Sequence, residues 1–303
     1  MYQKEGKKPK EISRWLRLHL SEGFVEISQT QITNLIQRVK KHDEPTMTVE
    51  MLKNWCDSHN AIPDDLDEVF AVSEFKITPD ELTFKIFLTT KRLISFTTKC
   101  KHIATDATYK LLWLNFPVLL CGTNDSDNTF HPFGVLLSRY ETESEFAYMF
   151  RTCKNLSFEL YGHDLDPSVL LADAAGAITN GFKSVFRLEK RIVCWAHVER
   201  KIDENLKGVD KDSKVQIKTD FKSIQGGVQQ RLFSTAFDLL EQKWCLRNDE
   251  NIKKFFDYFK TQWMSEYTLG WYETYAHGYP STNNGLESTN NTIKDEGTNR
   301  DRL

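Results

Sequence analysis

Apolar residues recur at helical spacing through the first sixty positions of the chain. Their separations of three and four residues predict one helix that starts near residue 10 and a second that ends near residue 41. Gly23 predicts a stop between the two helices, and Ser28 can cap the second one. A third helix is predicted at Val49–Ser58, within an acidic, Pro-containing segment typical of a linker. The apolar positions are Ile12, Trp15, Leu16, Leu18 and Leu20 in the first helix and Ile32, Leu35, Ile36 and Val39 in the second.

From about residue 100 the pattern changes to that of strands. Three apolar runs, at Ile103–Tyr109, Trp113–Gly122 and Phe130–Ser138, are separated by turn-forming segments. They predict a three-stranded antiparallel meander. Ahead of them, Phe84–Thr90 alternates weakly and predicts either a strand or the end of a helix.

Helices and strands alternate in the next part of the chain. The pattern predicts a helix at Glu143–Tyr161, a strand at Ser168–Asp173, a helix at Ala175–Phe186 and a strand at Arg191–His197. Three strands followed by two helix–strand crossovers predict an α/β fold, a mixed sheet flanked by helices. Residues 198–275 show only helical patterns and predict an all-α insertion.

These patterns predict four segments. Residues 1–75 form an N-terminal helical region with a linker, and residues 76–197 form the first part of the α/β core. Residues 198–280 form the α-helical insertion, and residues 281–303 supply the final helix of the core.

Composition and charge narrow the class of protein. A hydrophobic content of 40% with 20 Phe in 303 residues is enough for a packed core. No apolar run is long enough for a membrane span or typical of a secretory signal, so we expect no membrane partner. The six cysteines are scattered and form no Cys-x-x-Cys pair, so we expect free thiols in a reducing intracellular compartment. The net charge of -3 hides a basic start, because residues 1–41 hold nine Lys or Arg against four Glu. This start indicates contact with a polyanion, although solvated lysines explain it equally well.

The two N-terminal helices around a Gly-containing turn resemble a helix-turn-helix in outline. An ordinary helical hairpin is the alternative, and it is favoured because no base-reading residues can be identified. Arg14, Arg17 and Arg38 are the candidates in this hairpin for holding duplex DNA.

Three acidic residues stand where metal-bound carboxylates can be placed. Asp106 lies on the first strand of the meander, Asp173 at the carboxyl end of the fourth strand, and Glu287 just inside a helix predicted from residue 284. If the first and fourth strands are neighbours, Asp106 and Asp173 lie side by side and repel each other unless a cation neutralises them. An oxygen-only ligand set favours Mg²⁺ or Mn²⁺ over Zn²⁺. Together the acids predict a two-metal site for phosphoryl transfer on nucleic acid.

Polar residues continue along the predicted final helix. Glu287, Asn290, Asn291 and Lys294 fall on one face, and the last three are candidates for phosphate contact. Each acid also has a simpler explanation. Asp106 can cap a turn, Asp173 can cap the helix that begins near Ala175, and Glu287 can be a solvated helical glutamate.

Cys194 and His197 form a Cys-x-x-His pair at the end of the predicted fifth strand. Such a pair can be half of a zinc site, but no second Cys or His pair stands at the expected spacing, so structural zinc is not expected. Packing in the core or beside the active site is favoured, and a direct role on DNA or in proton transfer remains open.

Four motifs in order resemble the Mutator-like element (MULE) transposases, members of the DDE transposase superfamily with an RNase H-like catalytic core. The resemblance covers residues 80–297. It implies that Asp106, Asp173 and Glu287 are the catalytic and metal-binding triad, and that Cys194 and His197 are the family's Cys/His signature beside the active site. The motifs are Asp106-Ala107-Thr108-Tyr109-Lys110, Leu171-Ala172-Asp173-Ala174-Ala175-Gly176-Ala177-Ile178, Cys194-Trp195-Ala196-His197 and Thr282-Asn283-Asn284-Gly285-Leu286-Glu287-Ser288-Thr289-Asn290.

The resemblance implies metal-dependent cleavage of DNA and transfer of the cut strand. The partners implied are the transposon ends and target DNA, with a homo-oligomer in the active complex and a location in the nucleus. The sequence departs from many relatives, because it shows neither an N-terminal zinc finger nor a Cys/His-rich SWIM finger after the core. A shortened, decayed or domesticated transposase that binds DNA without catalysis is therefore the alternative, and a plain RNase H-like nuclease is disfavoured by the long α insertion.

Overall fold

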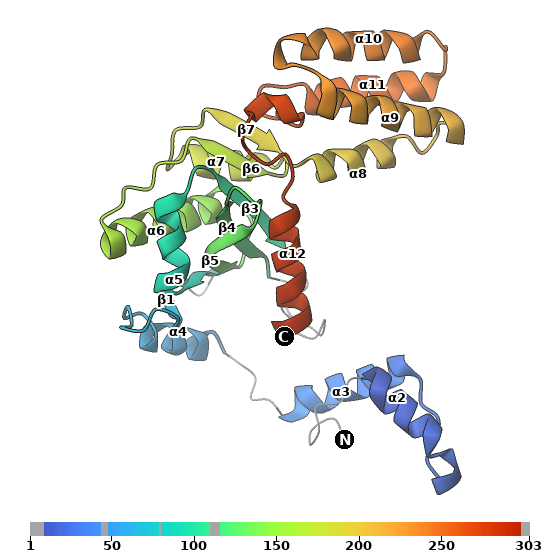
Figure 1. The fold of residues 1–303 in the computed structure, drawn as a ribbon. Coiled ribbons are helices and arrows are strands. Elements are labelled where there is room, and N and C mark those ends of the chain that lie inside the picture. The colour runs from blue at the N-terminus through green and yellow to red at the C-terminus, as the bar shows by residue number, and fades with distance from the viewer. Residues whose placement is uncertain (1–8, 44–47, 79, 110–115, 298–303) are drawn as a thin grey trace. The chain divides into compact units, whose positions relative to one another are not determined.

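The computed structural model describes residues 9–43, 48–78, 80–109 and 116–297. The contacts between residues divide the chain into two compact units, Met1–Asn54 and Trp55–Leu303. Elements are labelled as in Figure 1.

The first unit is helical, as its apolar spacing predicts. Gly23 has a left-handed φ of 88° and ends the turn that follows the first helix, which confirms the predicted stop. Ser28 and Gln31 cap the next helix reciprocally, since the Ser28 hydroxyl accepts from the Gln31 N–H and the Gln31 side chain accepts from the Ser28 N–H. The elements are α2 (Pro9–Leu18), a short 3₁₀ turn η1 (Leu20–Glu22), α3 (Gln29–Asp43) and α4 (Val49–Ser58), which continues into the second unit.

A seven-stranded mixed sheet organises the described part of the second unit (Figure 1). The strand order is β1-β2-β5-β4-β3-β6-β7. The predicted meander is confirmed, because β3, β4 and β5 pair antiparallel, whereas β6 pairs parallel to both β3 and β7. The strands are β1 (Phe70–Ile77), β2 (Leu82–Thr89), β3 (Ile103–Thr108), β4 (Val118–Asn124), β5 (Phe130–Ser138), β6 (Val169–Ala172) and β7 (Lys190–Val193).

Helices surround this sheet and form the insertion. The predicted range of α6 is reproduced, and the stretch after β7 is helical as expected. The helices are α5 (Lys91–Ser95), η2 (Phe96–Lys99), α6 (Glu143–Tyr161), α7 (Gly176–Lys183), α8 (Trp195–Asn205), α9 (Lys211–Gly227), η3 (Gln230–Leu232), α10 (Phe233–Cys245), α11 (Glu250–Trp263), η4 (Glu273–Ala276), α12 (Asn284–Thr292) and a π-helical turn η5 (Ile293–Gly297).

The structure corrects the prediction at two places. Strand β1 crosses the boundary expected at residue 75, because Phe70–Ile77 pairs along its whole length with β2 and so extends the sheet. The predicted fifth strand ends at Val193 instead of His197, since α8 begins at Trp195. The predicted start of the second meander strand at Trp113 and the turn before it lie outside the described residues.

The two faces of the sheet bury alternate residues of each strand. Ile103 and Leu170 pack on the face covered by α5, α6 and α7. Their neighbours Ala104 and Leu171 pack on the opposite face with Leu286 of α12. Asp106 follows Ala104 by two residues, so the alternation places it on the α12 face.

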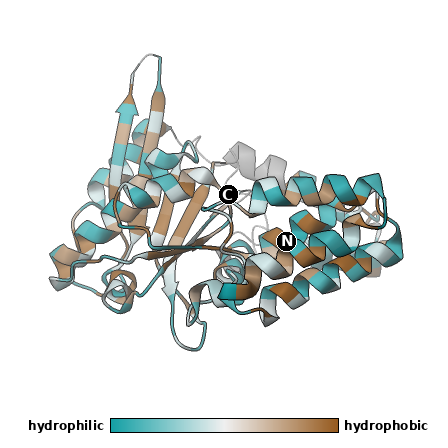
Figure 2. Cartoon of the chain, turned by 90° about the horizontal axis from the view of Figure 1, so that it is seen from above, coloured by the Kyte–Doolittle hydropathy of each residue, from teal (hydrophilic) through white to brown (hydrophobic). Residues whose placement is uncertain are grey.

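The insertion has its own aromatic core. Figure 1 shows α9, α10 and α11 packed beyond β7, with α8 leading into them. Phe221, Phe259 and Trp271 are buried at its centre, and Trp271 stacks on Trp195 with ring centroids 5.6 Å apart. Figure 2 shows hydrophobic residues along the strands and alternating hydrophobic and hydrophilic residues along these helices. None of the helices in the described ranges is both long and apolar enough to cross a membrane.

The segment after the insertion returns along β7, the last strand of the sheet. The N–H of Val193 donates to the carbonyl of Gly270 at 3.0 Å, which covers an otherwise open strand edge. A Cβ at Gly270 would lie 2.0 Å from the carbonyl oxygen of Arg191, so only glycine permits this approach. The segment then enters α12, whose residues contact β3 and β5. The expected fold class is confirmed, an RNase H-like mixed sheet flanked by helices.

Candidate active site

Asp106 and Asp173 lie at neighbouring positions of two parallel strands. Strand β3 pairs with β6 in the register Ile103 to Leu170 and Ala104 to Leu171. Continuing this register by two residues sets Asp106 opposite Asp173. The two acids predicted to be neighbours are therefore brought together.

His197 joins the two acids. One ligand atom each from Asp106, Asp173 and His197 lies within 4.8 Å of the other two, at partly buried positions. His197 reaches this place from the first turn of α8, because β7 ends next to β6 and α8 begins two residues later. Two carboxylates and an imidazole at this distance form a set of donors that a divalent cation can bind.

The electrostatics of Asp106 fit such a cation. Burial raises the pKa of Asp106 to about 7, and the negative charges of Asp173, Glu287 and Glu141 act in the same direction, against a backbone hydrogen bond from Ala107. A carboxyl group that is buried among other carboxylates binds its proton more tightly because the charged form is unfavourable. A bound cation would remove that cost.

Asp173 also has the local role that its sequence position suggests. Its Oδ1 accepts a hydrogen bond from the N–H of Ala175 at 2.9 Å, in the turn that leads into α7. This bond fixes one carboxylate oxygen. The capping explanation and the proximity to Asp106 therefore hold at the same time.

The buried guanidinium of Arg191 supports the backbone at Asp173. Arg191 is 2% exposed and donates to the carbonyls of Asp173, Ala172 and Ile192 and to the hydroxyl of Thr179. Burial lowers its pKa to about 10, and the charge of Asp173 opposes that change. Arg191 therefore holds the end of β6 from beneath and places a positive charge near the acids.

Glu287 is positioned through Asn283, the residue that precedes α12. The N–H of Asn283 donates to Cys194 Sγ at 3.3 Å, and its side-chain amide donates to the carbonyl of Thr105 at 3.2 Å. The N–H of Trp195 donates to the carbonyl of Ser281 at 3.0 Å in the same region. The start of α12 is thus tied to both β3 and the end of β7.

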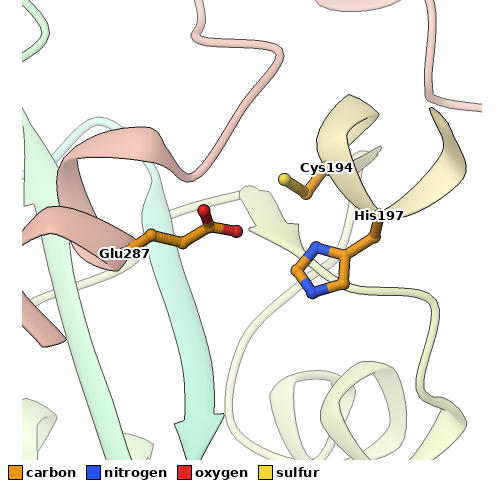
Figure 3. Close-up of side chains that lie close together, drawn as sticks. All are labelled: Cys194, His197 and Glu287. Carbon is orange, nitrogen blue, oxygen red and sulfur yellow. The ribbon is translucent and has the colours of Figure 1, made fainter. Parts of the chain in front are cut away.

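The carboxylate of Glu287 lies against the Cys/His pair. Ligand atoms of Cys194, His197 and Glu287 are all within 4.8 Å of one another. Figure 3 shows Glu287 reaching from α12 toward the other two side chains. The charge of Glu287 also raises the pKa of Asp106, so the third predicted acid belongs to the same region. His197 is the residue common to both clusters.

A fourth carboxylate, Glu141, lies near the site and was not predicted. Its carboxylate accepts a hydrogen bond from the hydroxyl of Tyr109. Burial raises the pKa of Glu141, and the charge of Asp173 adds to the increase. Burial, the bond to Glu141 and the charges of Glu141 and Asp173 raise the pKa of Tyr109 to about 12. The charge of Asp173 acts on both Tyr109 and Glu141, so the two residues lie near the acids.

The three residues near the end of the chain that were expected to contact DNA differ in how far they are exposed to solvent. Asn290 is 4% exposed, so its amide faces the protein rather than solvent. Asn291 is exposed and Lys294 is half-buried. The predicted polar stripe is therefore not one continuous surface, because Asn290 lies on the side of α12 that packs inward.

The basic candidates of the N-terminal unit lie on its two helices. Arg14 is exposed on α2. Arg17 is also exposed and pairs with Glu26 at 2.9 Å. Arg38 is in α3, at a position whose side chain is outside the described residues.

The fold and this group of acids define an RNase H-like domain with a candidate metal centre at the ends of its parallel strands. Residues 102–201 match the family model of the MULE transposase domain. This match confirms the resemblance to a MULE transposase domain over three of the four motifs, those of Asp106, Asp173 and the Cys194–His197 pair, whereas the motif around Glu287 lies outside the matched residues. A search of curated proteins found no relative of this chain.

Three residues at the site were not predicted to take part in it, although Asn283 stands within the fourth motif. The side chains of Asn283 and Arg191 act through hydrogen bonds to segments far away in the chain, and Glu141 stands in an ordinary loop. His197 was identified within its motif, but its place between the acids depends on where α8 starts. Only the register of β3 against β6 could have been anticipated, from the assumption that these strands are neighbours.

Proposed function

We propose that this chain is a DNA transposase that cleaves DNA strands and transfers the cut ends, through a divalent-metal site at Asp106, Asp173 and Glu287. The main support is the position of Asp106 and Asp173 at the ends of adjacent parallel strands. One ligand atom from each of these acids and from His197 lies within 4.8 Å of the other two. The MULE transposase domain over residues 102–201 supports DNA as the substrate.

The donors fit Mg²⁺ or Mn²⁺. Carboxylate oxygens predominate, and the raised pKa of Asp106 reflects negative charge that a cation would neutralise. The imidazole of His197 suits Mn²⁺ better than Mg²⁺. When bound, divalent cations would activate the attacking water or 3′-hydroxyl and stabilise the oxygen that leaves phosphorus.

The residues of the chain would hold this centre rigid. Asp106 is set by the β3–β6 register and Asp173 by its bond to Ala175, with Arg191 fixing the strand end. Asn283 anchors the helix that carries Glu287. Groups held by strands and buried hydrogen bonds keep their geometry as a substrate binds, which lowers the cost of reaching the transition state.

We propose that DNA approaches the site past the exposed side of α12, with Asn291 and Lys294 near its phosphates. Arg14, Arg17 and Arg38 of the N-terminal unit would add sequence-independent contacts to the duplex. Transposon ends and target DNA are then the partners, the active complex is a homo-oligomer, and the protein acts in the nucleus.

The test is Mg²⁺- or Mn²⁺-dependent nicking of supercoiled DNA by the full chain. Asp106→Asn, Asp173→Asn and Glu287→Gln should each lower the rate by roughly a hundredfold or more, because a lost metal ligand removes several kcal/mol of charge stabilisation. Glu199→Gln is the matched control, since Glu199 is an exposed carboxylate on α8 and should keep full activity.

Joining of the cut 3′ ends to a second DNA molecule distinguishes a transposase from a nuclease. DNA binding without nicking in either metal would reject the catalytic proposal and leave a DNA-binding protein. Equal loss in the Glu199→Gln control would show that the effect is not specific to the site.

A further inference from the structure

Cys194, His197 and Glu287 form a cluster whose chemistry differs from that of the paired aspartates. The cluster supplies a sulfur, a nitrogen and an oxygen atom within 4.8 Å of one another. We propose that these three residues form a thiophilic metal site that takes Zn²⁺, and that Zn²⁺ bound there holds Glu287 and His197 away from the Asp106–Asp173 pair. The binding site is independent of the proposed function, whereas the inhibition it predicts depends on that function.

The spacing of the donors suits a zinc ion. Bonds of about 2.0–2.3 Å in a tetrahedral arrangement separate the ligand atoms by about 3.3–3.8 Å. Donors that lie within 4.8 Å need only small rotations of the side chains to reach these distances. Figure 3 shows the Glu287 carboxylate already directed toward the other two groups. A sulfur and an imidazole ligand favour Zn²⁺ over Mg²⁺.

Hydrogen bonding around the cluster points to a ligand as well. The Nδ1 atom of His197 is buried and has no hydrogen-bond partner, although buried polar atoms normally have one. The Cys194 sulfur is buried and accepts backbone hydrogen bonds from Asn283, His197 and Ala196. Such N–H groups would stabilise a metal-bound thiolate and orient it as outer-shell partners do.

The site supplies three protein donors and so leaves a fourth position open for water. Structural zinc sites are closed by four protein ligands, whereas sites with three exchange their fourth ligand. His197 also belongs to the cluster with Asp106 and Asp173. Once Zn²⁺ binds the imidazole ring, the ring is no longer free to turn toward these two acids. Zn²⁺ should therefore oppose Mg²⁺ rather than replace it.

Binding can be measured without any catalytic assay. Cd²⁺ serves as the probe, because a Cd²⁺–thiolate bond gives a charge-transfer absorption in the ultraviolet, and Zn²⁺ should displace it. We expect one equivalent of Cd²⁺ to produce the band in the full chain. Cys194→Ser should abolish the band, and Cys245→Ser, which removes a thiol from the insertion, should keep it.

Two further variants keep the test valid if Cys194→Ser fails to fold. Glu287→Gln and His197→Gln should each weaken Cd²⁺ binding at least roughly tenfold, because even outer-shell partners of metal ligands contribute 10–100-fold. Asp173→Asn removes no donor of this cluster and should bind Cd²⁺ as the natural chain does. A band that survives Cys194→Ser, or equal affinities in the Glu287→Gln and natural chains, would overturn the proposal.

The functional consequence is a separate measurement. Zn²⁺ should inhibit Mg²⁺-dependent nicking, and Cys194→Ser should relieve that inhibition at least roughly tenfold in Zn²⁺ concentration. Nicking that is insensitive to Zn²⁺ while the band is present would reject the inhibitory role. A chain with the band but no nicking in Mg²⁺ or Mn²⁺ would instead reject the proposed function and leave the metal site standing.

Discussion

Replacing Asp106 with asparagine should stabilise the metal-free protein at neutral and alkaline pH. Burial and the charge of Asp173 raise the pKa of Asp106 from its ordinary 3.8 to about 7. The folded protein therefore keeps a proton on this group at pH values where the unfolded chain has released it. An asparagine side chain at this position would be neutral at every pH and would not carry this cost.

The sign and size of the effect follow from proton linkage. Between about pH 4 and about pH 7 the folded state binds more protons than the unfolded state, so the free energy of unfolding falls as the pH rises. A pKa raised from 3.8 to about 7 corresponds to a loss of about 4 kcal/mol once both states are ionised. Below about pH 4 the group is protonated in both states and its contribution to the pH dependence vanishes.

Urea denaturation followed by circular dichroism measures the difference, with EDTA present. At about pH 8, Asp106→Asn should unfold at a higher free energy than the natural chain, by up to about 4 kcal/mol, whereas at about pH 5 the gain should fall to about 1.7 kcal/mol. Asp67→Asn is the control. The pKa of Asp67 is lowered by its bond to Arg92, so removing its charge should give no gain at alkaline pH.

Divalent cations should narrow this difference in stability. At a Mg²⁺ concentration of about 100 times its dissociation constant, the natural chain should gain about 2.7 kcal/mol, and Asp106→Asn should gain much less. The refuting outcomes concern the comparison in EDTA. If Asp106→Asn is less stable than the natural chain at about pH 8, or if its advantage at about pH 5 equals its advantage at about pH 8, the raised pKa is not the cause and the reasoning fails.

Three further substitutions test how the site is held. Arg191→Lys should lower the free energy of unfolding by about 3 kcal/mol, because an ammonium group has fewer donors than the buried acceptors that the guanidinium satisfies. A loss below about 1 kcal/mol in urea denaturation would contradict this role. Asn283→Ala removes the bond to Thr105 and should lower the free energy of unfolding by about 1 kcal/mol. The nicking rate should fall roughly tenfold or more, because the helix that carries Glu287 loses this anchor, and an unchanged nicking rate would contradict the role of Asn283. Gly270→Ala should destabilise the fold by about 2 kcal/mol or more, read from thermal unfolding, because its Cβ would meet the carbonyl of Arg191; an unchanged midpoint would show that the backbone yields.

Helices with local signals were predicted well. The range of α6, Glu143–Tyr161, was reproduced, because Thr142 and Glu145 form a capping box at its start and Gly162 has a left-handed φ of 62° at its end. Helix α4 matches its predicted range for the same kind of reason, a helical apolar spacing. Signals of this type lie within a few residues of the element they define.

Elements that depend on distant partners were predicted less well. Strand β1 was missed because its residues are held by pairing with β2 and give only a partial alternation of burial. The strand predicted through His197 was wrong after Val193. The apolar run is compatible with a strand or with a helix. In the structure α8 begins at Trp195, whose N–H donates to the carbonyl of Ser281, a residue far along the chain.

The sequence by itself determined the α/β class, the order of the acids and the identity of the Cys/His pair. Periodicity and residue chemistry are local properties, so they can be read without the fold. Tertiary structure decided which groups meet. The β3–β6 register set Asp106 opposite Asp173, and Asn283 brought Glu287 to Cys194 and His197. These contacts join segments separated by tens of residues, and only packing of the whole sheet and its helices determines them.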